Sequence, residues 1–330
     1  MKILFVGQKN SHDGYLNDYM GDLLLHGLRE VYGNNVIDYP GSWHLYESES
    51  KNLDKNRLWG KGITTSNILN DYNLIDRSDI KKKIKNRFFD YIIYGSARRN
   101  NYLLEEAINY NNKIILVDGE DDNYIESKIL NKGLYFKREL KSYHKNVLPI
   151  SFAIPKNKIL KSESFNPNSL LSPLVPGRLK TYIYKDELSY YNMYQKSIFS
   201  LTYKKAGWDC LRHYEILMNG SIPFFLDLGE CPTLTMTNFP KKIIHDINSK
   251  FEDIFEYYNP FRIFKKKYLN LKRINNFFTF KFKKINLDKF LSKNEELLDY
   301  RYKLLIYTKN NLITEQLAKY VIKKFNEIEK

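Results

Sequence analysis

The segment at residues 204–223 (KKAGWDCLRHYEILMNGSIP) concentrates side chains that could bind an anionic ligand. Its pattern predicts a short loop, a helix of about ten residues and a return into a buried strand. The start of a helix carries partial positive charge and free N–H groups, so it suits a phosphate group. Gly207, in the loop, would let a ligand approach the backbone closely. The segment therefore predicts a phosphate-binding site at the start of the helix.

The charged residues of this segment could bind different parts of a nucleotide. Lys204, Lys205 and Arg212 supply positive charge for a diphosphate, which an arginine can bind through two parallel hydrogen bonds. Glu215 lies three residues after Arg212 on the same helix face, where its carboxylate could accept both hydroxyls of a ribose. His213 adds a further polar group. Together these residues favour a nucleotide site.

The same segment also has a purely structural interpretation. Asp209 would cap the start of the helix, and Asn219 with Gly220 would end it. The side chains facing the core would be Tyr214, Leu217 and Met218. Arg212 and Glu215 would then form an ordinary ion pair on one helix face. This interpretation explains Asp209 and Gly220, but it gives the cation and the carboxylate no specific role.

A loop after the first predicted strand, residues 2–6, supplies candidates for proton transfer. The loop leaves the carboxyl end of that strand, so it should face a crevice. His12 offers a base near neutral pH, as histidines do, and Asp13 could also accept a proton. In the alternative interpretation, Ser11 or Asp13 caps the helix that follows. Neither the dinucleotide-binding fingerprint nor the P-loop spacing occurs here.

An acidic cluster follows the predicted strand at residues 113–117. Asp118, Glu120, Asp121 and Asp122 could bind Mg²⁺, orient sugar hydroxyls or supply a base. A solvated helix start, where the helix dipole favours acidic side chains, is the competing account. The position directly after a buried strand favours a function, so we assign Asp118 to catalysis and Glu120 and Asp121 to an acceptor cleft.

Two cations end the next predicted strand, at residues 133–136. Lys137 and Arg138 could meet a phosphate group in the same cleft. Surface salt bridges are an equally good explanation of this pair. Both interpretations therefore stay open.

Both halves of the chain alternate apolar strand-like runs with helical segments, which predicts an α/β fold with parallel sheets. The expected strands are residues 2–6, 35–38, 91–94, 113–117, 133–136, 181–184, 198–202, 222–226 and 242–245. The expected helices include residues 15–32, 80–87, 187–196 and one or two helices between 301 and 325. Residues 148–176 contain five prolines and predict a linker. Two such halves would place a crevice between the carboxyl ends of both sheets.

The composition excludes several classes of protein. A length of 330 residues with 43% hydrophobic residues suits two globular domains, and no apolar run is long enough to span a membrane. The net charge of +15 reflects a lysine-rich bias, and no module that reads nucleic acid is recognisable, so nucleic acid is not an expected partner. Cys210 and Cys231 lack metal-ligand spacing, so we expect no metal site and a cytoplasmic location.

Residues 261–284 interleave aromatic and basic side chains without an acid. This mixture suits peripheral contact with a membrane face or binding of single-stranded nucleic acid. It also suits an ordinary element with apolar stems inside and ammonium groups outside. The second interpretation is favoured, and the membrane contact is an alternative.

The spacing of residues 191–223 resembles the C-terminal signature of the exostosin-like glycosyltransferases, which is roughly Y-x2-L-x2-S-x-F-x-L, a glycine loop and R-x2-E-A-x3-G-C-I-P. The matching positions are Tyr191, Tyr194, Ser197, Phe199, Leu201, Gly207, Arg212, Glu215, Gly220, Ile222 and Pro223. The chain also resembles bacterial and viral glycosyltransferase-like proteins with a WDCxRHYEI helix, an upstream DGEDD and YFKRE. It departs from the signature at Met218 and Asn219, and Ser221 stands in place of a cysteine.

This resemblance implies a GT-B fold of two Rossmann-like domains, here residues 1–155 for the acceptor and 156–330 for the donor. The final helix would pack back on the first domain. The donor would be a UDP- or GDP-sugar, with no obligatory metal. Arg212 would contact the diphosphate and Glu215 the ribose, while Gly220 and Ser221 would line the turn near the nucleotide. The base of such enzymes often lies in an N-terminal loop, which suits His12 or Asp13.

Overall fold

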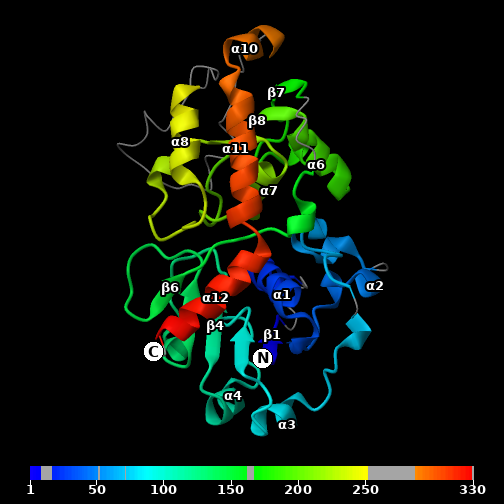
Figure 1. Cartoon of the computed structure of the whole chain (residues 1–330), viewed down its shortest axis with the longest axis vertical. Helices are drawn as coiled ribbons and strands as arrows, with labels where there is room; N and C mark the ends of the chain where they lie inside the picture. Colours follow the sequence, from blue (N-terminus) through cyan, green and yellow to red (C-terminus); the bar gives the residue numbers. More distant parts are fainter. Residues whose placement is uncertain (9–16, 51–52, 71, 162–166, 252–286, 329–330) are drawn as a thin grey trace.

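A computed structural model of the chain describes residues 1–8, 17–50, 53–70, 72–161, 167–251 and 287–328. Within these ranges the chain forms two parallel β-sheets with flanking helices (Figure 1). The larger sheet has the order β2-β1-β3-β4-β5-β6 and the smaller sheet the order β7-β8-β9. The predicted α/β class with parallel sheets is confirmed, and the arrangement is Rossmann-like.

Continuous apolar runs form the strands because both faces of each sheet are covered. The strands are β1 (Ile3–Val6), β2 (Val36–Tyr39), β3 (Tyr91–Tyr94), β4 (Ile114–Asp118), β5 (Leu134–Lys137), β6 (Val147–Pro149), β7 (Ser169–Leu171), β8 (Ser197–Thr202) and β9 (Ile222–Phe225). Every residue of β1, β3, β4, β8 and β9 is buried. Strands buried on both faces are mostly apolar in sequence, which is why most of them could be predicted.

The helices lie between the strands or follow the second sheet. They are α1 (Tyr19–Tyr32), α2 (Glu47–Ser50), α3 (Ile80–Lys85), α4 (Leu104–Tyr110), α5 (Ser127–Leu130), α6 (Glu187–Gln195), α7 (Leu211–Met218), α8 (Lys241–Lys250), α10 (Leu287–Lys293), α11 (Glu296–Asn311) and α12 (Thr314–Ile328). Short 3₁₀ helices are η1 (Gly33–Asn35), η2 (Trp43–Leu45), η3 (Lys55–Arg57), η4 (Trp59–Gly62), η5 (Tyr72–Leu74), η6 (Lys156–Lys158), η7 (Leu179–Thr181) and η8 (Leu228–Glu230).

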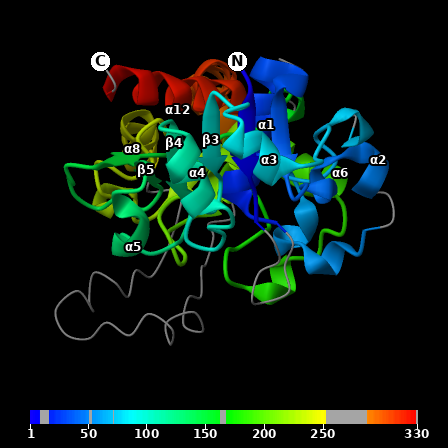
Figure 2. The ribbon, with the colours of Figure 1, turned by 90° about the horizontal axis from the view of Figure 1, so that it is seen from below.

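Helix α12 returns from the second half and packs against α1 beside the larger sheet (Figures 1 and 2). Its close approach depends on Gly27, because a Cβ atom there would lie 1.9 Å from the carbonyl oxygen of Thr314. A buried hydrogen bond of 2.8 Å joins His26 Nδ1 to Thr314 Oγ1 beside this contact. The chain therefore crosses between its two sheets a second time, after α11.

Four elements differ from the sequence-based prediction. Residues 181–184 form no strand; η7 ends at Thr181 and irregular backbone follows. The predicted strand at 242–245 lies inside α8, whose Ile244 and Ile247 are buried at helical spacing. Strands β6 and β7 both fall in the region predicted as a linker, and β7 pairs with β8. The proline-rich stretch is therefore partly built into both sheets.

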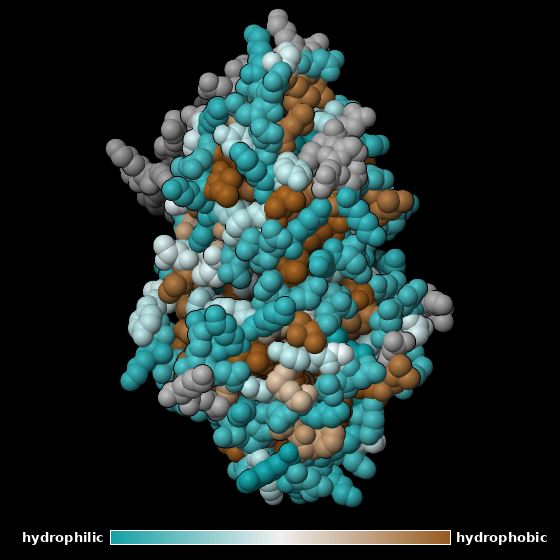
Figure 3. Space-filling model, in the orientation of Figure 1, coloured by the Kyte–Doolittle hydropathy of each residue, from teal (hydrophilic) through white to brown (hydrophobic). Residues whose placement is uncertain are grey.

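In the described ranges, no helix is both long enough and apolar enough to cross a bilayer. The face seen in Figure 3 is mostly hydrophilic, with hydrophobic residues in separate small groups. Residues 261–284, where we expected a possible membrane contact, lie outside the described residues.

Candidate functional site

A cavity of about 570 Å³ lies between the two halves of the chain. The loop after β4 and the start of α1 line one side, and the start of α7 lines the other. Of the residues predicted from the sequence, the cavity brings together Glu120, Asp121, Arg138, Lys205, Arg212 and Glu215. This is the place, at the carboxyl ends of parallel strands, where α/β folds bind ligands.

Arg212 projects from the first turn of α7 into the cavity wall. Its Nη2 atom donates to the hydroxyl of Tyr182 at 3.0 Å, and the guanidinium lies 5.9 Å from the centre of the Tyr182 ring. Its Nη1 atom is closed to solvent and has no hydrogen-bond partner in the described part of the chain. Burying a guanidinium nitrogen without a hydrogen-bond partner costs free energy. An acceptor placed beside Nη1 would therefore stabilise Arg212.

Glu215 lies on the same wall and is only 6% exposed. Its Oε1 atom accepts from Thr64 Oγ1 at 2.7 Å, and its Oε2 atom accepts from the Tyr190 hydroxyl at 2.8 Å. Burial raises the pKa of Glu215, while these two hydrogen bonds and the charge of Arg212 act in the opposite direction. Its partners are these two hydroxyls, so the ordinary ion pair between Arg212 and Glu215 that we considered is not formed among the described residues.

His213 is a core residue and does not reach the cavity. It is fully buried, and its ring centre lies 4.4 Å from that of Phe225. Because Nε2 lies 2.9 Å from the carbonyl oxygen of Trp208, that nitrogen carries the proton, and Nδ1 accepts from Thr202 Oγ1 at 2.9 Å. Burial lowers the pKa of His213 to about 3. The imidazole is therefore neutral at physiological pH.

Gly220 and Ser221 lie at the far end of α7 and do not line the cavity. Gly220 has a left-handed backbone with φ of 70°, which lets the chain turn from α7 into β9. Ser221 is buried and hydrogen-bonds to Ser200 Oγ at 2.8 Å. In the structure both residues shape the helix-to-strand turn.

The loop before α7 gives its three predicted residues different environments. A Cβ atom on Gly207 would lie 2.5 Å from Glu139 Oε1, so this glycine makes room for a protein carboxylate. The backbone nitrogen of Lys204 donates to Asp227 at 3.1 Å, and its ammonium group lies 5.2 Å from the Trp208 ring. Of the three, only Lys205 lines the cavity.

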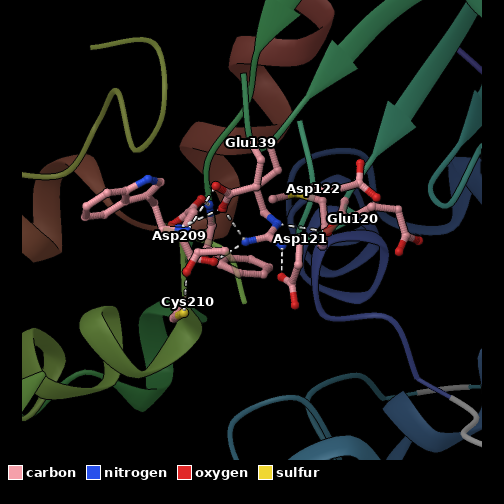
Figure 4. Close-up of polar contacts among 12 residues, drawn as sticks. Glu120, Asp121, Asp122, Glu139, Asp209 and Cys210 are labelled. Atoms are coloured by element: carbon pink, nitrogen blue, oxygen red, sulfur yellow. Dashed lines mark hydrogen bonds and ion pairs between the residues drawn. The ribbon is translucent and has the colours of Figure 1, made fainter. Parts of the chain in front are cut away.

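Glu139 and Arg138 join the larger sheet to this loop, in a cluster that we call the junction (Arg138, Glu139, Trp208 and Asp209). The Glu139 carboxylate accepts from the backbone nitrogens of Trp208 at 3.0 Å and Asp209 at 2.8 Å. Arg138 donates to the Asp209 carbonyl and also binds Asp121. In Figure 4, Glu139 and Asp209 approach from the two halves, with Asp121 beside them. Both Lys137 and Arg138 are thus buried, rather than part of surface salt bridges.

Asp209 does not cap α7, which corrects the structural interpretation of the sequence. Its carboxylate accepts instead from the backbone nitrogen of Phe152 at 2.9 Å and from the Tyr214 hydroxyl at 2.7 Å. The cap position is Cys210, which makes no side-chain cap bond. Burial raises the pKa of Asp209 to about 7, although the nearby Arg138 acts against this shift.

Asp118 and Lys137 form a buried ion pair within the larger sheet. They are register partners in β4 and β5, with 3.0 Å between Lys137 Nζ and Asp118 Oδ1 and no side-chain exposure. The Tyr135 hydroxyl also donates to Asp118 at 2.7 Å. Burial raises the pKa of Asp118, and Lys137 opposes this shift. Neither residue lines the cavity, so Asp118, predicted as catalytic, does not reach the cavity wall.

The rest of the acidic cluster is also neutralised by cations. Glu120 binds Arg99, and Asp122 binds Arg98 at 2.7 Å. No helix begins at these residues, since α5 starts at Ser127, so they are not a solvated helix start. No group of three potential metal ligands occurs in the ranges that the structure describes. His12 and Asp13 lie outside the described residues.

Several residues of the cavity wall were not identified from the sequence. Tyr182, Tyr190 and residues 59–61 line the cavity, and Thr64 contacts Glu215 behind the wall. The glycines of residues 60–62 (GKG) were the one local signal, since both adopt positive φ. The aromatic residues carry no comparable signal, because tyrosine is common throughout the chain.

Comparisons with known proteins add no family to this description. No family model matches the sequence, and no curated protein matches it. The described residues form a Rossmann-like α/β fold with a cavity at the carboxyl ends of the larger sheet. The side chains on the cavity wall are therefore the features that bear on function.

Proposed function

We propose that the chain is a GT-B glycosyltransferase that moves a sugar from a UDP- or GDP-sugar to a hydroxyl group in glycan or surface-polysaccharide assembly. The observation that carries this proposal is Arg212, whose Nη1 atom has no described partner at the cavity wall. Because Nη1 is closed to solvent, the side chain turns to present this nitrogen to the diphosphate on binding. The resemblance of residues 191–223 to the exostosin-like donor signature supports the same assignment.

In the proposed reaction, the bond between the sugar carbon and the diphosphate oxygen breaks while a bond to the acceptor oxygen forms. Arg212, Lys205 and the start of α7 stabilise the negative charge that develops on the leaving diphosphate. Glu215 holds the ribose. The acceptor proton passes to a base, for which His12 and Asp13 are the candidates from the sequence. Among the described cavity acids, Asp121 is the alternative, with a side chain that is 59% exposed.

The test is a calorimetric titration of UDP and GDP into the wild type, Arg212→Ala and Arg57→Ala. Arg57 is an exposed arginine outside the cavity wall, so its replacement makes the same change in net charge. Loss of charge-assisted hydrogen bonds should weaken binding by Arg212→Ala on the order of 10- to 100-fold. The control should bind like the wild type. No binding by the wild type, or equal binding by Arg212→Ala, refutes the proposal.

A non-catalytic protein that binds nucleotides or glycans is the second candidate. One observation favours it: every carboxylate described on the cavity wall already accepts a hydrogen bond or an ion pair. These residues are Asp18, Glu120, Asp121, Asp209 and Glu215. Nucleotide binding without transfer or hydrolysis of UDP- and GDP-sugars would support this candidate. Activity that disappears in His12→Ala, Asp13→Ala or Asp121→Asn would exclude it.

A further inference from the structure

Thr64, from the first half of the chain, makes a buried contact with Glu215 in the second half. Its side chain is fully buried, and Oγ1 donates to Glu215 Oε1 at 2.7 Å. Because a hydroxyl has a single proton, the Tyr191 hydroxyl, 2.6 Å away, must donate to Thr64. A chain of hydrogen bonds therefore runs from Tyr191 through Thr64 to Glu215.

The backbone around Thr64 is held in an unfavourable conformation. Thr64 has φ of 71°, which a β-branched residue rarely adopts. Its backbone nitrogen donates to Glu187 Oε2 at 3.0 Å, which fixes this conformation. Five residues earlier, the backbone nitrogen of Trp59 donates to Asn17 Oδ1 at 2.7 Å, so the segment is also anchored to the first half. Thr64 is thus held from both halves.

Two hydroxyl donors leave the Glu215 carboxylate half-occupied. Thr64 takes one lone pair of Oε1, and Tyr190 takes one of Oε2. Each oxygen of a carboxylate has two lone pairs, so one acceptor site remains on each oxygen. Two acceptor sites side by side on a fixed carboxylate match the two neighbouring hydroxyls of a cis-diol.

We propose that Thr64 is a positioning residue that orients Glu215 to bind the 2′- and 3′-hydroxyls of a ribonucleotide in the cavity. The inference rests on the proposed function and adds a selectivity for ribose over deoxyribose to it. Without the Thr64 hydroxyl, Glu215 rotates more freely, and its Oε1 atom loses the donor that fixes it. The paired acceptor geometry, and with it the preference for a diol, is then lost.

The experiment compares UDP and GDP with their 2′-deoxy counterparts by calorimetric titration. Thr64→Val keeps the shape and the β-branch but removes the hydroxyl, whereas Thr64→Ser keeps the hydroxyl. The wild type should prefer the ribonucleotides. Thr64→Val should bind them about tenfold more weakly, with a smaller loss for the deoxynucleotides, which keep only the 3′-hydroxyl. Thr64→Ser should retain the wild-type ratio, and the larger loss of ribonucleotide than of deoxynucleotide binding in Thr64→Val is the effect that a merely structural role does not predict.

The outcomes separate the inference from the function on which it rests. If the wild type binds none of the four nucleotides, both the proposed function and this inference fail. If it binds them with equal affinity for ribose and deoxyribose, or if Thr64→Val keeps the preference, the inference alone fails. Should Thr64→Val not fold, Glu215→Gln provides the second variant, and it should lose the preference for ribose as well. Retention of that preference by Glu215→Gln would equally overturn the inference.

Discussion

The junction and the cavity wall each contain an arginine and a glutamate, but the two pairs differ in their hydrogen-bond and ion-pair partners. At the junction, Arg138 and Glu139 are buried and bonded to each other and to the backbone of the facing half. On the cavity wall, Arg212 has a nitrogen without a described partner, and the described partners of the Glu215 carboxylate are hydroxyl groups. Arg138 and Glu139 are thus bonded to each other as an ion pair, whereas Arg212 and Glu215 on the cavity wall form no ion pair among the described residues.

The largest expected effect comes from breaking the junction. Glu139→Ala removes the acceptor of the Trp208 and Asp209 backbone nitrogens and one partner of Arg138. Because these groups are then buried without an acceptor, the free energy of unfolding should fall by about 3–5 kcal/mol. Urea denaturation followed by circular dichroism measures this change.

The matched control for this variant is Glu105→Ala. Glu105 pairs with Lys132, but its side chain is 72% exposed. Loss of this surface pair should change the free energy of unfolding by less than about 1 kcal/mol. A similar loss of stability in both variants would mean that the junction is no different from the surface.

A second prediction concerns the pH dependence of the junction. Because the pKa of Asp209 is about 7 in the folded chain and 3.8 is its ordinary value, the folded chain keeps a proton that the unfolded chain releases. This group therefore stabilises the fold below about pH 4, and its contribution is lost as the pH rises through 7. Asp209→Asn is uncharged throughout and should lose stability less steeply between these pH values.

Thermal unfolding at pH 4, 5.5, 7 and 8 checks this prediction. The comparison of variant with wild type isolates Asp209, because His213, whose pKa is about 3, contributes with the opposite sign in both proteins. The difference in melting temperature between the variant and the wild type should grow in favour of the variant as the pH rises to 7. Parallel pH profiles would show that Asp209 does not titrate in this range.

The smallest expected effect is the stability of Arg212→Gln. This change removes one hydrogen bond to Tyr182, but it also removes a guanidinium whose Nη1 atom is buried without a described partner. The two contributions oppose each other, so the free energy of unfolding should change by less than about 1 kcal/mol. A loss as large as that of Glu139→Ala would place Arg212 in the structural framework and remove the contrast between the two regions.

The sequence predicted the strands whose identity depends on burial alone. Apolar runs such as residues 91–94 are recognisable because a parallel strand is covered on both faces. Short strands such as β7, with three half-buried residues, have no such signature. The predicted strand at 181–184 has high β-propensity, yet Ile183 is 67% exposed and no strand lies beside it. High β-propensity alone therefore did not produce a strand at residues 181–184, which lack a described strand to pair with.

The candidate site was predictable only where one element carries it. Arg212 and Glu215 share a face of α7, so their spacing indicated that they act together. Thr64 reaches Glu215 across 151 positions in the sequence, and no local pattern can indicate such a contact. The junction was missed for the same reason, because Arg138 and Glu139 find their partners at residues 208 and 209 only when distant segments meet.

The packing of α12 on α1 has a consequence for the order of events during synthesis. Helix α1 emerges early from the ribosome, but α12, which packs against it, is translated near the end of the given sequence. Until residues 314–328 have been translated, the first half exposes apolar surface that the mature chain hides. Nascent chains of this protein should therefore depend on protection by chaperones for longer than a protein whose first domain closes by itself.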